Sequence, residues 1–429
     1  GSLYDSRNLC ATPGYFPLML DMFGDRGKKL IASVYLCDTL PEVECRPDFF
    51  DRWLADDYLL IGADGRPVRA GWSESRRAPN LLHPAARAHF LGHIREIARR
   101  FGPHPALLGF DLWDGWRLNG YNDSIIALFE SETGIKLDAG TGADRFRRRA
   151  AELCGIRRAA WNKWRAQKNT DLIAEMAGIL RETRADLKLY VTTCAAGGNC
   201  DTPAVRGRLT DIAMDRGIDL AALQQLPNVV VTPVRQPTYF RWQQHRGGGY
   251  LAIDELQNNM ASLAFFKTPD SAIYSYLRYF EAFMKSLKPE IYQCMFQNAD
   301  VKPHGRFFLA ELARCVTAND PALLLIGAQP LGTMGRDAEA REFAQAFRAL
   351  PAISFMDVPG MNDPVKMRMR QTANGLYLYA ANLTWGDATA DLVITGAASA
   401  TDLSSGENLP LSAERPLDLK LKPFEVKAL

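Results

Sequence analysis

The chain has 429 residues, of which 47% are hydrophobic and 23% are charged. These proportions match ordinary globular proteins, exclude a disordered chain and leave enough apolar material for a large core. Lys and Arg number 51 against 49 Asp and Glu, a net charge of +2, whereas a protein that neutralises phosphates carries a basic surplus. We therefore expect no nucleic-acid partner. No apolar run approaches the ~18 residues that span a bilayer, so we expect no membrane partner either.

The spacing of cysteines and histidines predicts neither a metal site nor a cofactor. The eight cysteines form no CxxC pair, the six histidines form no HExxH or HxH pair, and no phosphate-binding glycine loop occurs. Cys37 with Cys45, and Cys194 with Cys200, are close enough in sequence to form disulfides in an oxidising compartment. Free buried thiols are the alternative, so the redox compartment stays open. We place the protein in the periplasm or outside the cell ahead of the cytoplasm.

The first part of the chain predicts a helix, a strand and a long loop. Residues 15–27 have a helical pattern that ends in glycine, and the apolar run 30–36 has the length and composition of a buried parallel strand. The loop at 37–82 is rich in Pro, Asp, Arg and Gly, and loops of this length are more often functional than mere connectors. Apolar residues at helical spacing, with proline at the first position, predict a helix over 84–101.

Helices and strands then alternate, which is the pattern of repeated βα units and a parallel sheet. The expected elements are a strand at 106–110, helices within 144–183, strands at 187–193 and 229–234, a helix at 271–287, a strand at 291–296, a helix at 306–318, a strand at 323–327 and a helix at 336–349. With the strand at 30–36, these make six parallel strands, whereas a closed (β/α)8 barrel needs eight. Either the first 29 residues hide a strand, or the opening strands of the barrel lie upstream.

The sequence changes its pattern after Pro359-Gly360. Val365, Met367 and Met369 alternate with charged residues, turn pairs follow, and no helical segment occurs. Alternation with period two predicts antiparallel strands with one buried face. We expect an α/β protein with two domains: a (β/α)8-type barrel over 1–357 and an antiparallel β-sandwich over 358–429.

The strongest candidate site lies where the strand after residue 106 ends, in the sequence Gly109-Phe110-Asp111-Leu112-Trp113-Asp114-Gly115-Trp116. The carboxyl ends of parallel barrel strands face the active site. Carboxylates flanked by indoles suit sugars, since acids act on the glycosidic centre and flat aromatic rings pack on sugar C–H groups. The structural alternative is that Asp111 is a buried hydrogen-bonding residue and Trp113 belongs to the core.

Two further segments carry candidate site residues. The sequence from Tyr292 to Asp300 is also a strand that ends in polar residues, although Asn298 and Asp300 could instead satisfy backbone N–H groups at a helix start. The aromatic and glycine-rich stretch 234–259 suits a substrate-binding loop. The candidates from these segments, together with two that follow Trp116 and Asp300, are Asn119, Arg235, Tyr239, Trp242, Asn298, Asp300 and His304.

The stretch from Pro17 to Trp116 resembles the barrel of clan A glycoside hydrolases, especially the family 42 β-galactosidase-like group and the bacterial family 10-like group. The elements that carry the resemblance are the turn Ala63-Asp64-Gly65-Arg66, the pair Pro79-Asn80, the strand start His104-Pro105-Ala106-Leu107-Leu108-Gly109, the residues Trp161, Trp164 and Arg165, and the C-terminal Leu421-Lys422-Pro423-Phe424-Glu425-Val426. The resemblance implies a barrel with an accessory sandwich, and makes the strand at 30–36 the third of eight. Aligned on Gly109, the catalytic Asn-Glu of such enzymes falls on Asp114-Gly115, so the expected glutamate is absent.

The prediction is therefore a glycoside hydrolase that uses two carboxylates, Asp114 as general acid/base and Asp300 as the second. The sugar site would be lined by Asp111, Trp113, Trp116, Asn119, Arg235, Tyr239, Trp242, Asn298 and His304. A catalytically silent barrel that binds carbohydrate or scaffolds an assembly is the alternative, because of the missing glutamate. A deacetylase would need a metal or nucleophile constellation, which the sequence does not contain. If six strands form the barrel, an upstream segment or a partner molecule, such as a second copy, should cover its open edges.

Overall fold

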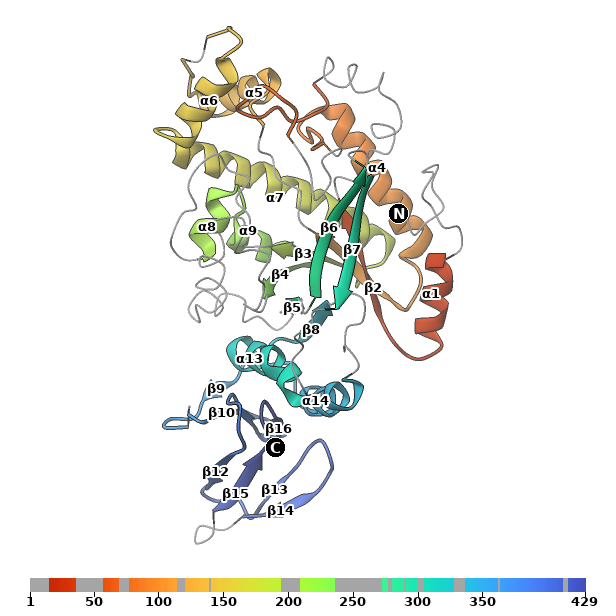
Figure 1. The fold of residues 1–429 in the computed structure, drawn as a ribbon, viewed down its shortest axis with the longest axis vertical. Helices are drawn as coiled ribbons and strands as arrows, with labels where there is room; N and C mark the ends of the chain where they lie inside the picture. Colours follow the sequence, from red (N-terminus) through yellow and green to blue (C-terminus); the bar gives the residue numbers. More distant parts are fainter. Residues whose placement is uncertain are drawn as a thin grey trace. The chain divides into compact units, whose positions relative to one another are not determined.

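The computed structural model describes residues 15–35, 57–68, 77–113, 120–138, 140–193, 209–235, 272–276, 280–288, 291–298, 305–327, 336–361, 363–411 and 416–429. The chain forms two compact units, Gly1–Thr232 and Pro233–Leu429 (Figure 1). No helix in the described ranges is both long enough and apolar enough to cross a membrane.

The first unit contains strands that alternate with helices. Its helices are α1 (Tyr15–Gly24), α4 (Pro84–Phe101), α5 (Asp123–Thr133), α6 (Arg145–Cys154), α7 (Arg158–Thr183), α8 (Leu209–Asp215) and α9 (Leu220–Gln224). Its strands are β1 (Leu30–Tyr35), β2 (Leu107–Trp113), β3 (Lys188–Thr193) and β4 (Val229–Arg235), the last of which continues into the second unit. The helices and strands predicted for residues 15–27, 30–36, 84–101, 106–110, 144–183, 187–193 and 229–234 are confirmed, with ends that differ by a few residues.

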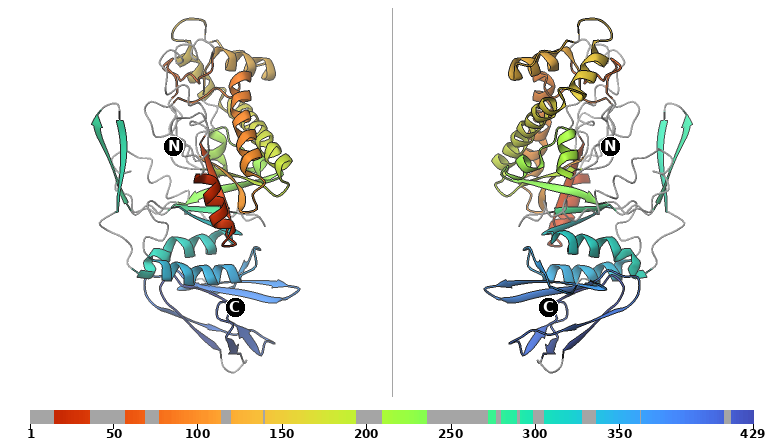
Figure 2. Two further views of the ribbon diagram at one scale, coloured as in Figure 1. Left: turned by 90° about the vertical axis from the view of Figure 1, so that its right-hand side faces the viewer. Right: turned by 90° about the vertical axis from the view of Figure 1, so that its left-hand side faces the viewer.

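The strands of the first unit form a parallel sheet. β1 pairs with β2 and β2 with β3, both in parallel, and β4 lies next to β3. Helix α7 contacts both α4 and β3, so the long helices lie against the sheet (Figures 1 and 2). Leu107, Phe110 and Leu112 of β2 and Leu189 and Val191 of β3 are buried, which is why these strands have continuous apolar runs rather than alternating ones.

Helix α4 shows how the sequence sets the limits of an element. Pro84 is at the start of the helix, where a backbone N–H would have no helical partner. Gly102 is the C-cap residue, and a Cβ added there would lie 2.4 Å from the carbonyl oxygen of Ala98. Only glycine therefore fits where the chain leaves α4 and turns toward β2.

An aromatic cluster fills the core between α5, α6 and α7. The rings of Trp161 and Trp164 stack with centroids 5.2 Å apart, and Phe129 meets both edge-on. Trp164 Nε1 donates to a carboxylate oxygen of Glu132 at 2.6 Å, which satisfies the polar atom of a buried indole. Trp161 and Trp164, which carried part of the resemblance, therefore belong to the core of the helical part and not to a strand end.

The second unit combines parallel strands, a hairpin, helices and antiparallel sheets. Its elements are β5 (Ala272–Tyr276), β6 (Phe280–Lys288), β7 (Ile291–Asn298), η2 (Gly305–Leu309), α13 (Ala310–Asn319), β8 (Leu323–Gly327), α14 (Asp337–Ala349), β9 (Met356–Asp357), β10 (Val365–Thr372), β11 (Gly375–Asn382), β12 (Ala388–Leu392), β13 (Ser399–Thr401), β14 (Asn408–Pro410), β15 (Leu417–Leu421) and β16 (Val426–Ala428). The last residues of β4 pair in parallel with β5, and β5 pairs in parallel with β8.

Two predictions for the second unit are wrong. Residues 271–287, predicted as a helix, contain strands β5 and β6 instead. The strand at 291–296, predicted to be parallel, belongs to β7, which pairs with β6 in an antiparallel hairpin. The tyrosines and phenylalanines of this stretch recur near helical spacing, but they also favour strands, and periodicity cannot separate the two in short apolar runs. The parallel sheet still has six strands among the described residues, because β5 takes the place expected for 291–296.

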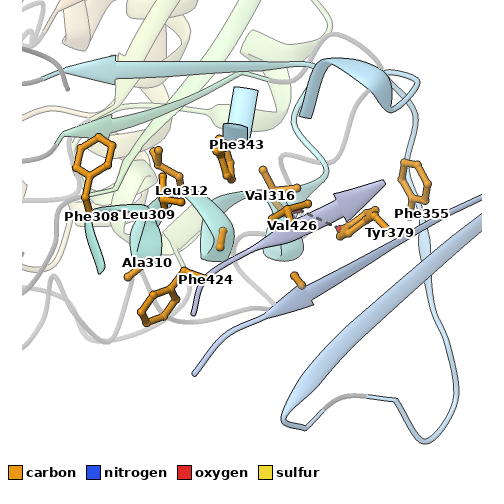
Figure 3. Close-up of a cluster of buried hydrophobic side chains, with 12 residues drawn as sticks. Phe308, Leu309, Ala310, Leu312, Val316, Phe343, Phe355, Tyr379, Phe424 and Val426 are labelled. Carbon is orange, nitrogen blue, oxygen red and sulfur yellow. Dashed lines mark hydrogen bonds between the residues drawn. The ribbon is translucent and has the colours of Figure 1, made fainter. Parts of the chain in front are cut away.

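The antiparallel region after residue 357 has a core on each face of β10 and β11. Val365 and Met367 of β10 pack with Leu419 and Leu421 of β15 on one face. On the other face, the cluster drawn in Figure 3 joins β11 and the segment around Phe424 to α13, α14 and Phe355. The predicted alternation at 365, 367 and 369 is thus confirmed, and the antiparallel region shares its second core with two helices that precede it.

Candidate functional site

Asp111 lies near the carboxyl end of β2, the strand end that the sequence predicts to carry chemistry. Its neighbours in the ladder are Ser33 of β1 and Tyr190 of β3. Only 2% of the Asp111 surface is exposed, so its carboxyl group is inside the protein and not at the surface. A buried carboxyl is costly unless it is hydrogen-bonded or neutral, which makes its partners decisive.

Two hydroxyl groups hold the carboxyl of Asp111. Thr192 Oγ1 on β3 donates to Asp111 Oδ1 in a short hydrogen bond, and Ser33 Oγ on β1 donates to Oδ2 at 3.4 Å. No cation among the described residues forms an ion pair with Asp111. Burial therefore dominates and raises the pKa of Asp111 to about 6, although the hydrogen bonds from Thr192 and Ser33 act in the opposite direction.

The backbone approaches closely on the same part of the sheet. A Cβ added to Gly109 would lie 2.2 Å from the carbonyl oxygen of Lys188 and 3.0 Å from the ring of Tyr190, so only glycine fits at this position of β2. On β4, the fully buried Thr232 continues the series of hydroxyl residues, since the bond from Leu189 N–H to the Asn228 carbonyl sets the register of β3 and β4. Thr192 and Thr232 thus occupy corresponding positions of β3 and β4, two residues beyond the level of Ser33, Asp111 and Tyr190.

This arrangement has a clear chemical capacity. A carboxyl group whose pKa is about 6 exchanges its proton near neutral pH, as a general acid or base must. The donors Thr192 and Ser33 fix its orientation, which pre-organises the group. The same geometry also serves a purely structural carboxyl, so the site needs a functional test of Asp111.

The structure describes the backbone, but not the side chains, of three other predicted site residues. Trp113 is the last residue of β2 and Arg235 the last of β4, so both are at the carboxyl ends of parallel strands, as expected. Asn298 ends β7, where it pairs with Phe280 in the antiparallel hairpin. The premise that a parallel strand brings Asn298 and Asp300 to the site is therefore wrong, and their roles stay predictions.

The remaining predicted site residues lie outside the described residues. They are Asp114, Trp116, Asn119, Tyr239, Trp242, Asp300 and His304. The cysteine pairs Cys37/Cys45 and Cys194/Cys200 also lie outside them, whereas Cys154 and Cys315 form no disulfide among the described residues.

Sequence reasoning missed Ser33 and Thr192. Both are small polar residues in otherwise apolar strands, which is a signal that a sequence does contain. Their meaning depends on the register between β1, β2 and β3, however, and register is not readable from one sequence. The pattern to seek would have been a hydroxyl on each strand that flanks a carboxyl, one at its level and one two residues beyond.

A second polar cluster secures the second half of the long loop at 37–82. Asn122 Nδ2 donates to Asp57 Oδ1 at 2.5 Å and to the Leu59 carbonyl at 2.7 Å, while Asn122 Oδ1 accepts from Ile61 N–H at 2.8 Å. Asn80, from the Pro79-Asn80 element of the resemblance, donates to the Asp57 carbonyl at 3.0 Å. These asparagines therefore hold turns together, and this cluster has a structural role.

Metal binding finds no support in the part of the chain that the structure describes. There, no group of three or more His, Cys, Asp or Glu side chains could hold an ion.

Asn382, the first residue of an Asn-Leu-Thr glycosylation sequon, is fully buried and donates to the carbonyl oxygens of Gly386 and Lys422. The sequon is therefore not accessible in the folded protein.

No protein-family model and no curated protein matches this chain. Among solved structures, it is similar to the β-galactosidase of the psychrophile Marinomonas ef1, at 14% identity and a TM-score of 0.42 over 73% of this chain and 47% of that one. It is similar to the α-amylase of Geobacillus thermoleovorans, at 11% identity and a TM-score of 0.47 over 97% and 80%. It is similar to the isomaltulose synthase of Klebsiella sp. LX3, at 10% identity and a TM-score of 0.49 over 99% and 90%.

The chain thus spans less than half the length of the β-galactosidase named first. The solved structures similar to this chain include GH42 β-galactosidases, the group named in the resemblance, and α-amylases.

Proposed function

We propose that the protein is a glycoside hydrolase that cleaves O-glycosidic bonds at the carboxyl end of its parallel sheet. Asp114 is the general acid/base and Asp300 the second carboxylate, which acts as nucleophile or as base for water. The sugar is bound by aromatic and polar side chains at and after the ends of the parallel strands β2 and β4 and of the hairpin strand β7. They are Trp113, Trp116, Asn119, Arg235, Tyr239, Trp242, Asn298 and His304.

The buried carboxyl of Asp111 is the observation that supports this proposal. Burial at this strand end raises the pKa of Asp111 to about 6, so the protein interior here disfavours a carboxylate charge. An aspartic acid can protonate a leaving oxygen at neutral pH only where its surroundings raise its pKa in this way. Asp114 follows Asp111 by three residues and comes directly after β2 in the sequence.

Asp111 itself is proposed as a positioning residue for Asp114. When Asp111 is ionised, its charge disfavours a second carboxylate nearby and so helps Asp114 to keep its proton. Thr192 and Ser33 hold Asp111 in place for this purpose. Its substitution should therefore shift the pH dependence of the reaction, whereas substitution of Asp114 should remove the acid/base step.

The proposal also includes the architecture of the parallel and the antiparallel parts of the chain. The parallel strands form part of a (β/α)8-type barrel, and the antiparallel region from 358 forms a β-sandwich. The two faces of β10 and β11, each covered by its own core, support the sandwich in part. The six parallel strands support the barrel in part.

A catalytically silent barrel that binds carbohydrate is the second candidate. The position of the expected glutamate is occupied by Gly115, after Asp114, and this departure favours it. The two candidates differ in turnover but not in sugar binding.

The test is turnover of a panel of aryl glycosides beside binding of the corresponding free sugars. The proposal expects at least one glycoside to be cleaved, and cleavage to fall in Asp114→Asn while sugar binding persists. Asp171→Asn is the matched control, because Asp171 is an exposed acid on α7 that bonds only to Gln167 in the described structure. Binding without cleavage of any glycoside would instead establish the silent barrel.

A further inference from the structure

Strand β1 is less buried than its composition calls for. Its sequence, Leu-Ile-Ala-Ser-Val-Tyr, is as apolar as that of β2, yet Leu30, Ile31, Ala32 and Val34 are only half-buried and Ser33 is exposed. By contrast, Leu107, Phe110 and Leu112 of β2 are buried, and so are Leu189 and Val191 of β3. β1 pairs with β2 on one side, and no described strand pairs with its other side. Such an edge offers unpaired backbone N–H and carbonyl groups to another strand.

Helix α1, which leads into β1, has an exposed apolar stripe. Tyr15, Leu18 and Met22 are 48%, 54% and 46% exposed, and their spacing of three and four residues places them on one side of the helix. The other side is buried through Leu20 and through Phe16, whose ring meets Phe101 edge-on at 4.8 Å. The stripe is therefore a second apolar surface of α1, beyond the one that α1 packs onto its own unit.

We propose that the edge of β1 and the stripe of α1 form one interface, with a second copy of this chain as the occupant. Strand pairing satisfies the backbone groups of β1, and the stripe meets its own counterpart. In a two-fold dimer each copy presents the same patch, so the patch must be complementary to itself. Two edge strands related by a two-fold axis run antiparallel, which is also the more stable pairing.

The charges beside the stripe support self-association. The end of α1 and the turn after it carry the exposed acids Asp21 and Asp25 and the exposed bases Arg26, Lys28 and Lys29. A patch with both signs can place the acids of one copy against the bases of the other, whereas a patch of one sign would repel itself. A partner whose surface carries charges of only one sign fits this mixed patch less well.

The interface adjoins the candidate site. Ser33 is the exposed residue of β1, and its hydroxyl donates to Asp111 at 3.4 Å. A second copy paired along β1 would therefore also shield the Ser33 side of the Asp111 carboxyl. The dimer proposal does not depend on glycoside hydrolysis. A monomeric chain would leave the proposed hydrolase activity untouched, and an inactive chain could still form the dimer.

Sedimentation velocity of the whole chain tests the proposal, from about 1 to 100 µM, the range in which interfaces of modest size associate. The proposal expects a species of twice the 47.8 kDa chain mass at high concentration. The double variant Leu18→Glu/Met22→Lys should be monomeric and should melt at the temperature of the dilute, monomeric wild type, since both side chains are exposed and a Glu–Lys pair four residues apart suits a helix. Ile156→Lys is the matched control, because Ile156 is also apolar and is 85% exposed in the same unit.

Hydrogen exchange separates this interface from others. Backbone amides of residues 30–35 should exchange more slowly as the concentration rises, and this protection should vanish in the double variant. A wild-type chain that stays monomeric up to about 100 µM would overturn the proposal. A dimer that survives the double substitution, or that forms without protection of β1, would overturn it as well.

Discussion

The guanidinium of Arg368 lies 2.9 Å from Asp320 Oδ2, and both side chains are almost completely buried, at 3% and 2% exposure. Tyr379 Oη donates to Asp320 Oδ1 at 2.7 Å, and Phe355 N–H donates to Oδ2 at 2.9 Å. Arg368 also donates to the Thr317 carbonyl at 2.9 Å. The network joins the end of α13 to β10 and β11, so a helix and the antiparallel sheet are held by one buried ion pair.

We expect Arg368→Met to lower the free energy of unfolding by about 3–5 kcal/mol, because it leaves the Asp320 charge buried without its cation. Arg370→Met is the matched control, since Arg370 lies on the same strand and is exposed, and it should change stability by less than about 0.5 kcal/mol. Urea unfolding of both variants gives the comparison. Equal stabilities would show that the pair contributes nothing beyond an apolar side chain of similar length.

Tyr379→Phe removes one hydrogen bond of the same network and leaves the ion pair between Arg368 and Asp320 in place. Burial, and then the Asp320 charge, raises the pKa of Tyr379 well above its usual value, so the hydroxyl remains a donor at every accessible pH. Loss of this bond to a charged group should cost about 1.5–3 kcal/mol, since Asp320 keeps its other partners. The loss should be the same at pH 6 and pH 9. A loss that disappears at pH 9 would mean that Tyr379 ionises there.

Separating residues 358–429 from the rest tests the predicted domain boundary. The cluster of Figure 3 places Phe424 and Tyr379 in one core with Leu312 of α13 and Phe343 of α14. A chain ending at residue 357 should therefore expose this core, bind hydrophobic dyes and lose the cooperative unfolding of the second unit. A cooperative transition for each fragment, at temperatures matching the intact chain, would instead establish two independent domains.

The sequence predicted local features better than relationships between distant segments. The helix at 84–101 followed from apolar spacing and Pro84, and five of the six parallel strands followed from short apolar runs. The stretch 271–287 was wrongly predicted because its aromatic residues suit either period, and only pairing with neighbouring strands decides between them. In the site, the carboxyl of Asp111 was visible as an acid at a strand end. Its partners Ser33 and Thr192 were not, because they meet it only through strand register.

Asp111 should give stability a defined pH dependence. Its pKa of about 6 in the folded protein lies above the ordinary 3.8, so the folded state binds this proton more tightly than the unfolded chain. The free energy of unfolding should therefore fall as the pH rises from about 4 to 6, by up to about 3 kcal/mol, and then level off. Asp111→Asn should remove this fall and Asp171→Asn should keep it, as measured by urea unfolding across this pH range. Parallel curves for Asp111→Asn and the wild type would contradict the assignment.

Thr192→Val should act mainly when Asp111 is ionised. The variant removes the hydroxyl that donates to Oδ1, so it should destabilise the protein by about 1–3 kcal/mol above pH 6 and by less at pH 4. Ser33→Ala should have a smaller effect, because its bond is longer, at 3.4 Å, and Ser33 is exposed. Urea unfolding at the two pH values checks this ranking. A larger effect from Ser33→Ala would reverse the assigned roles of the two hydroxyls.

The central claim, glycoside hydrolysis with Asp114 as acid/base, is tested most directly by the rate of Asp114→Asn on two substrates with different leaving groups. A poor leaving group needs protonation, so its cleavage should fall by roughly 10²–10⁴-fold, the usual scale of a lost general acid. An activated aryl leaving group needs little protonation, so the step that breaks its bond should fall much less. Equal and modest losses on both substrates, accompanied by a lower melting temperature, would contradict the claim and make Asp114 structural.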